Sequence, residues 1–107
     1  MLKLCCFFAT FLFLSCKSTS YFVVRHAEKE TATMSSDVPL SAEGKQRAEA
    51  LKEVLLHKNI QSIYSTNYIR TKATAQPLAE AENLTIQTYD SADTGFVSRI
   101  KNTHTGN

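Results

Sequence analysis

The chain has 107 residues, of which 43% are hydrophobic, and its formal net charge is +2 at pH 7. These values are those of an ordinary globular protein, and the sequence has no internal repeat or low-complexity tract. Acidic and basic residues are interspersed, without the dense basic run that a nucleic acid partner would need, so nucleic acid binding is not expected.

The first 15 residues have the pattern of a secretory signal peptide. Lys3 precedes an almost unbroken apolar run from Leu4 to Leu14, which is shorter than the roughly 20 residues that span a bilayer. The stretch FLFLSC sets a small residue directly before Cys16. It therefore resembles a bacterial lipoprotein box, which implies cleavage before Cys16 and attachment of lipid to it. An uncleaved anchor and a buried hydrophobic strand are the alternative interpretations.

This leader predicts where the protein resides and what its cysteines do. We expect export to the cell envelope, removal of residues 1–15, membrane anchoring through lipidated Cys16, and a tether that extends to residue 20. All three cysteines, Cys5, Cys6 and Cys16, lie in or beside the leader. The mature chain would then keep no thiol for a disulfide, a zinc site or a nucleophile, so its fold must rely on its core.

Residues 21–107 alternate strand-like and helix-like patterns and form one predicted domain of about 90 residues. The aromatic and β-branched run YFVV at 21–24 predicts a first strand, buried on both faces of a parallel sheet. A polar loop follows. Ser41 is a favourable N-cap, and apolar residues recur at helical spacing after it, so a helix is predicted over 42–57. Asn59 is expected to end this helix.

Two further strand–helix pairs complete the predicted domain. Residues 60–64 predict a second strand, followed over 67–82 by an alanine-rich helix that Pro77 is expected to kink or break. Residues 84–89 alternate as a third strand does, and 96–104 predict a last helix. This order predicts an α/β fold with right-handed βαβ connections and a parallel sheet.

Charged residues follow two of the predicted strands, at their carboxyl ends. Arg25, His26 and Glu28 come after the first strand, and Arg70 lies early in the helix after the second. Ligands bind at this edge of open α/β sheets, so the two arginines are expected to meet in one pocket. Two guanidinium groups match a phosphate, and an imidazole beside it can attack phosphorus. His26 and Glu28 are only two metal ligands without a third, so no metal site is expected.

Three segments in this order, VVRHAEK, PLSAEGKQRAEAL and YSTNYIRTKATA, resemble the histidine phosphatase superfamily, also called phosphoglycerate mutase-like. The resemblance implies a three-layer α/β/α fold with a parallel sheet, and no cofactor. It makes His26 the transiently phosphorylated nucleophile and makes Arg25 and Arg70 the phosphate-binding arginines. The implied activity is hydrolysis of phosphate monoesters or related phosphoryl groups, on a phosphorylated small molecule or a phosphoprotein.

The resemblance is incomplete toward the C-terminus. The family uses a second histidine on the loop after a fourth strand, and neither His57, at the end of a helix, nor His104, after a helix, fits that position. We therefore expect a domain truncated at its C-terminus, short by roughly 50 residues judging by the size of a βαβ unit. A non-catalytic anion-binding envelope lipoprotein, or an inactive fragment, is the alternative function.

Three carboxylates are candidates for the acid that gives a proton to the leaving oxygen, and the sequence does not decide between them. Family members often present a carboxylate on the segment after the third strand, where Asp90 and Asp93 lie. Glu28 is the third candidate, as an acid or as a contact to the substrate.

Overall fold

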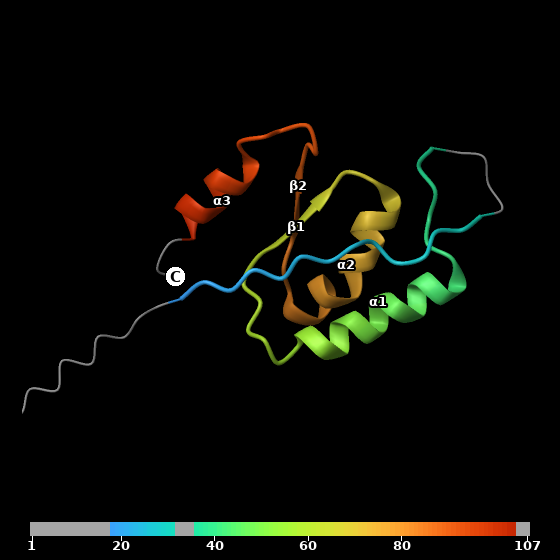
Figure 1. Ribbon diagram of the computed structural model, residues 1–107. Coiled ribbons are helices and arrows are strands. Elements are labelled where there is room, and N and C mark those ends of the chain that lie inside the picture. The colour runs from blue at the N-terminus through green and yellow to red at the C-terminus, as the bar shows by residue number, and fades with distance from the viewer. Residues whose placement is uncertain (1–17, 32–35, 105–107) are drawn as a thin grey trace, which may run out of the picture.

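The computed structural model describes residues 18–31 and 36–104 (Figure 1). The predicted signal peptide and Cys16 lie outside these ranges. Within them the element order is α1 (Ala42–Leu55), β1 (Ile63–Thr66), α2 (Ile69–Glu82), β2 (Ile86–Tyr89) and α3 (Phe96–Thr103). The two strands pair in parallel, with Ile63 opposite Ile86 and Thr66 opposite Tyr89, and α2 connects them. The predicted α/β class with a parallel sheet is thus confirmed.

The prediction of a strand over 21–24 is wrong. These residues are extended, but none of them pairs with a strand among the described residues, where the sheet consists of β1 and β2 alone. The side chain of Val23 is almost fully exposed, at 97% of its maximal area. A strand needs a neighbour to pair with, and among the described residues none lies beside this run. The amide of Ala27, which follows the run, donates to the Thr74 hydroxyl of α2 rather than to a strand.

The helices form close to their predicted positions because their end signals are local. The side chain of Ser41 accepts a hydrogen bond from the Gly44 amide, as an N-cap does, and α1 ends two residues before the predicted bound. The prediction that Asn59 ends this helix is wrong, because the C-cap is Leu56. Asn59 follows three residues later in the left-handed conformation, with φ 54°. α2, by contrast, does end at an asparagine in this conformation, Asn83, whose amide donates to the carbonyls of Ala79 and Glu80.

Of the two effects expected of Pro77, a kink or a break, the break does not occur, since α2 runs through this residue. A proline removes only its own backbone donor from the helical ladder. The neighbouring residues Thr74, Leu78 and Ala79 are buried, so tertiary packing on both sides of Pro77 holds the helix together.

The two faces of the sheet carry different layers, as expected for a three-layer α/β/α fold. On one face, Ile63 packs into a core with Leu55 of α1 and Leu78 and Ala79 of α2. On the other face, the Phe96 ring of α3 stacks on Tyr89 at 3.9 Å between ring centroids. It also meets the edge of Tyr64 at 5.6 Å. Figure 1 shows α3 on the far side of the strands from α1 and α2.

The segment before α1 runs along the molecule from the end of α3 to the start of α1. It begins near the end of α3, where the Thr19 hydroxyl donates to the His104 carbonyl, and it reaches the start of α1 at residues 27–30 (Figure 1). There the amide of Glu30 donates to the carbonyl of Pro39, beside a single antiparallel bridge between Lys29 and Leu40. None of the helices in the described ranges is both long and apolar enough to cross a bilayer.

Candidate active site

The candidate site is built around the short segment that carries Arg25 and His26. Its anchor is Ala27, only 6% exposed, which packs with Leu40, Ala48 and Ala73 in a small cluster between α1 and α2. Because every side chain in the cluster except Leu40 is a methyl group, the backbone of the segment can approach both helices closely. The chain around His26 is therefore held on two sides.

The start of α1 holds this segment from one side. The carbonyl of Glu28 accepts hydrogen bonds from the amide of Ser41 (2.9 Å) and from its hydroxyl (3.2 Å). The same hydroxyl caps the helix by accepting from the Gly44 amide. Gly44 lies so close to the Glu28 backbone that a Cβ atom there would overlap the Glu28 carbonyl. The sequence PLSAEG is thus a structural clamp on the residues that follow His26.

The second turn of α2 holds the segment from the other side. The amide of Ala27 donates to the Thr74 hydroxyl at 3.0 Å, and this hydroxyl donates to the Arg70 carbonyl at 2.7 Å. Through these bonds the structure brings the residue after His26 to the turn that carries Arg70. Two of the predicted site residues, far apart in sequence, therefore lie on adjoining pieces of backbone.

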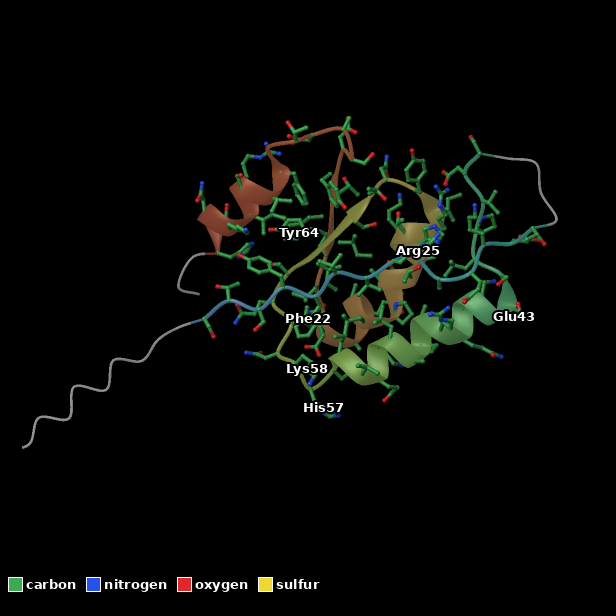
Figure 2. All side chains as sticks on the ribbon, in the orientation of Figure 1. Phe22, Arg25, Glu43, His57, Lys58 and Tyr64 are labelled. Atoms are coloured by element: carbon green, nitrogen blue, oxygen red, sulfur yellow. The ribbon has the colours of Figure 1, made fainter. Side chains whose placement is uncertain are left out.

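The imidazole of His26 is half-buried and has a defined orientation. Its Nδ1 atom lies 2.8 Å from the Ala27 carbonyl. A carbonyl oxygen can only accept, so Nδ1 carries the proton of this bond, and the lone pair of the neutral ring is on Nε2. Arg25 is exposed and makes no hydrogen bond or ion pair with other described residues. Figure 2 shows Arg25 beside the first turns of α2.

Arg70 extends from the first turn of α2 toward the residues before α1. Its guanidinium lies over the Tyr68 ring, 4.4 Å from the centroid, and its Nη1 donates to the Ser36 carbonyl at 3.3 Å. Its Nε atom is buried and has no acceptor in the described part of the chain. The amide of Ile69, at the start of the helix, donates to the Asp37 carboxylate at 2.8 Å. The start of α2 thus already binds one carboxylate, and the Nε–H group of Arg70 has no hydrogen-bond acceptor among the described residues.

Two of the three candidate acids are paired with arginines. The Arg47 guanidinium, hydrogen-bonded to Glu28, lowers the pKa of the Glu28 carboxyl below its usual value. Arg99 likewise lowers the pKa of Asp93, which also accepts from the Gly95 amide at the start of α3. An acid that stays ionised is a poor proton donor near neutral pH.

Asp90 lies at the carboxyl end of β2. Its carboxylate accepts from the amide of Ala92 at 2.9 Å, and its side chain is exposed. With Thr66 and Tyr68 it lines an open hollow of about 450 Å³ at the ends of the two strands. Of the three carboxylates it is the one without an arginine partner among the described residues.

The other two histidines lie away from this site. His57 is exposed beyond the end of α1, and Figure 2 shows it at the opposite end of that helix from Glu43. The Nε2 atom of His104 lies 2.8 Å from the Tyr64 hydroxyl, on the α3 face of the sheet. In residues 18–31 and 36–104, no three His, Cys, Asp or Glu side chains gather closely enough to hold a metal ion.

Sequence reasoning missed three residues that shape this site. Thr74 lies one turn after Arg70 in an alanine-rich helix, Arg47 pairs with Glu28, and Asp37 binds the start of α2. The signal that the sequence offered for Thr74 is its spacing, four residues after Arg70 on the helix. Nothing in the sequence distinguishes Arg47 or Asp37 from other surface charges.

The chain is similar to proteins of one known family. The sequence model of the histidine phosphatase superfamily (branch 1) matches residues 21–92. Among solved structures, mycobacterial glucosyl-3-phosphoglycerate phosphatase in complex with inorganic phosphate is 28% identical, with a TM-score of 0.53 over 60% of this chain. The native structure of that enzyme is 23% identical over 76% of this chain, also with a TM-score of 0.53.

This chain covers less than half of the length of either solved structure. The chain covers 31% of the phosphate-bound structure and 44% of the native one. No curated protein matches the sequence significantly. The family match includes the His26 segment, the clamp of α1 and the whole of α2, which are the parts that build the site. On this match, the chain belongs to the histidine phosphatase superfamily.

Proposed function

We propose that this chain supplies the nucleophile and the phosphate-binding arginines of a phosphatase that acts through a phosphohistidine on His26. The observation that carries the proposal is the orientation of the His26 ring, whose Nδ1–H bond to the Ala27 carbonyl leaves the Nε2 lone pair available for attack. The membership in a phosphatase superfamily and the similarity to a sugar-phosphoglycerate phosphatase support the reaction class.

In the proposed reaction, Nε2 of His26 attacks the phosphorus of a phosphate monoester. The bond between phosphorus and the ester oxygen breaks, and the leaving oxygen takes a proton from an acid. Water then attacks the phosphohistidine and gives a proton back to the same acid, the bond between phosphorus and nitrogen breaks with its electron pair returning to Nε2, and inorganic phosphate leaves. The charge on the transferred oxygens is balanced by the guanidinium groups of Arg25 and Arg70. Asp90 is our candidate for the acid, because it lines the hollow at the carboxyl ends of the two strands, whereas Glu28 and Asp93 are paired with arginines.

The substrate that we propose is a small phosphorylated molecule. The related mycobacterial enzyme is named for glucosyl-3-phosphoglycerate. The hollow beside Asp90 is open, and its lining includes Thr66, Thr88 and Ser91. Such a hollow suits a polar alcohol as the leaving group. A phosphoprotein remains the other class of substrate for the same chemistry.

Hydrolysis of p-nitrophenyl phosphate by the full chain, in buffer with a metal chelator, tests the reaction. We expect His26→Ala to remove turnover almost entirely and Arg70→Ala to lower kcat about 10²- to 10³-fold, as loss of a donor to the transition state does. His57→Ala, in the exposed residue beyond α1, is the control and should leave turnover unchanged.

The intermediate is tested separately by acid quenching after addition of the substrate. Phosphate should be found on His26 as an acid-labile, base-stable adduct. Turnover that survives His26→Ala, or that stops with the chelator and returns with a divalent ion, would contradict the proposal. Binding of inorganic phosphate without adduct or turnover would instead favour the non-catalytic anion-binding function.

We also propose that the protein is an exported lipoprotein, anchored in the membrane of the cell envelope through Cys16. The support is the apolar run that ends in Leu14, Ser15 and Cys16. Mass spectrometry of membrane-extracted protein should find an N-terminal Cys16 that carries diacylglycerol, and Cys16→Ser should release the protein from the membrane. A soluble protein that retains Met1 would exclude this anchor.

A further inference from the structure

One buried polar group in the structure has no part in the chemistry proposed above. Thr74 is 7% exposed, in a helix whose other buried residues, Leu78 and Ala79, are apolar. A buried hydroxyl is unfavourable unless its hydrogen bonds are satisfied. Thr74 satisfies them with two backbone groups from different parts of the chain, the amide of Ala27 and the carbonyl of Arg70.

The direction of the hydroxyl is fixed by its partners. The Arg70 carbonyl can only accept, so the hydroxyl proton points to it, and a lone pair of the same oxygen faces the Ala27 amide. A hydroxyl bond to the carbonyl four residues earlier is common in helices and carries no special meaning. Thr103 makes the same bond to the Arg99 carbonyl on α3, where it is exposed. What distinguishes Thr74 is the second bond, to the residue after His26.

We propose that Thr74 is a positioning residue, which fastens the His26 segment to the turn of α2 that carries Arg70. The inference rests on the proposed function for its catalytic consequence, but the fastening itself does not depend on it. In-line attack requires the nucleophile and the bound phosphate at a defined separation, and a misplacement of about 1 Å can lower the rate about 10²-fold. The Ala27 amide is the point where the nucleophile's segment and the arginine's helix meet.

Two comparisons of variants at position 74 distinguish the effect of the hydroxyl from the effect of side-chain shape. Thr74→Val keeps the shape and removes the hydroxyl, whereas Thr74→Ser keeps the hydroxyl. Thr74→Ala, compared with Thr74→Ser, repeats the test with smaller side chains in case the valine variant does not fold. Thr103→Val is the control, because it removes a hydroxyl that makes only the bond within its helix.

The first measurement is hydrogen exchange of backbone amides by NMR on the full chain in mild detergent. We expect the Ala27 amide to be protected in the wild type, Thr74→Ser and Thr103→Val, and to exchange about tenfold faster in Thr74→Val and Thr74→Ala. The amides of Leu78 and Ala79 report whether α2 stays folded. Equal protection of Ala27 in all variants, or loss in Thr74→Ser as well, would overturn the inference.

The second measurement is turnover of p-nitrophenyl phosphate. We expect Thr74→Val to lower kcat about 10- to 100-fold while KM changes by less than about threefold, with recovery in Thr74→Ser. A folded valine variant with normal kcat contradicts the positioning role. If the wild type shows no turnover while the exchange pattern is as expected, the proposed function fails and the fastening by Thr74 stands.

Discussion

At the scale of single residues, the ion pair between Glu28 and Arg47 ties the His26 segment to the exposed side of α1. Arg47 lowers the pKa of Glu28 from its ordinary value of 4.5. The folded state therefore binds this proton less readily than the unfolded chain does. The pair stabilises the fold above the unfolded pKa, and its contribution is lost as the pH falls through the lowered, folded pKa. Both side chains are exposed, so the contribution is small and decreases with salt.

Carboxyl NMR titration checks this pair. We expect Glu28 to titrate below 4.5 in the wild type and to return toward this value in Arg47→Gln. The matched control is Arg99→Gln, which removes the corresponding partner of Asp93. It should raise the pKa of Asp93 and leave that of Glu28 unchanged. A Glu28 midpoint that is the same with and without Arg47 would show that the pair does not form in solution.

The candidate site residues predicted from the sequence, Arg25, His26 and Arg70, are those whose residue type alone indicates a chemical role. An arginine and a histidine at the end of an apolar run, with a second arginine early in a helix, indicate an anion and a nucleophile by their types alone. Thr74 could not be assigned in this way, because its role depends on an amide 47 positions earlier. Glu28 was left open for the same reason: its pKa depends on Arg47, whose proximity only the fold determines.

At the scale of elements, the His26 segment and α1 are in backbone contact at Gly44. Replacing a glycine inside a helix with alanine ordinarily stabilises it by about 1 kcal/mol. Here the added methyl would overlap the Glu28 carbonyl, so we expect Gly44→Ala to destabilise the fold by about 1 to 3 kcal/mol, as overpacking does. Chemical denaturation measures the change.

The matched control for this contact is Gly95→Ala, at the start of α3. There a Cβ atom would meet the end of the Arg99 side chain at 3.2 Å, which can move aside. We expect the free energy of unfolding to change by no more than about 0.5 kcal/mol in this variant. If Gly44→Ala is as stable as the wild type, the close approach of α1 to Glu28 is not present in solution.

Helices and strands differ in how well local sequence signals predict them. Helix starts and stops depend on local groups such as the Ser41 cap and the left-handed Asn83, and these were placed within about two residues of the observed bounds. The run at 21–24 is different. Its apolar composition indicates a tendency to be buried, but a strand also needs a neighbour to pair with, and no described strand lies beside it. Pairing is a property of the whole sheet and cannot be read from one segment.

At the scale of the whole molecule, the described core is small. Its buried hydrophobic residues, apart from Val38, fall into two clusters, and no large side chain in residues 18–31 and 36–104 is fully buried. Four consecutive apolar side chains, at residues 21–24, are each close to half exposed or more. A domain with little buried apolar area has a small margin over the conformational entropy of its chain. We therefore expect a soluble version that starts at residue 17 to unfold broadly and at low temperature.

Two substitutions separate the contributions of the core and of the exposed run to this behaviour. Val23→Lys changes a side chain that is 97% exposed, so it should leave the unfolding midpoint unchanged while it reduces aggregation and the binding of a hydrophobic dye. Leu78→Ala removes a side chain that is 4% exposed, which typically costs about 2 to 5 kcal/mol. In a fold of small margin this loss should abolish the cooperative transition in circular dichroism. A sharp transition at high temperature in the wild type, or a large loss of stability in Val23→Lys, would show that residues 21–24 are buried and paired in solution.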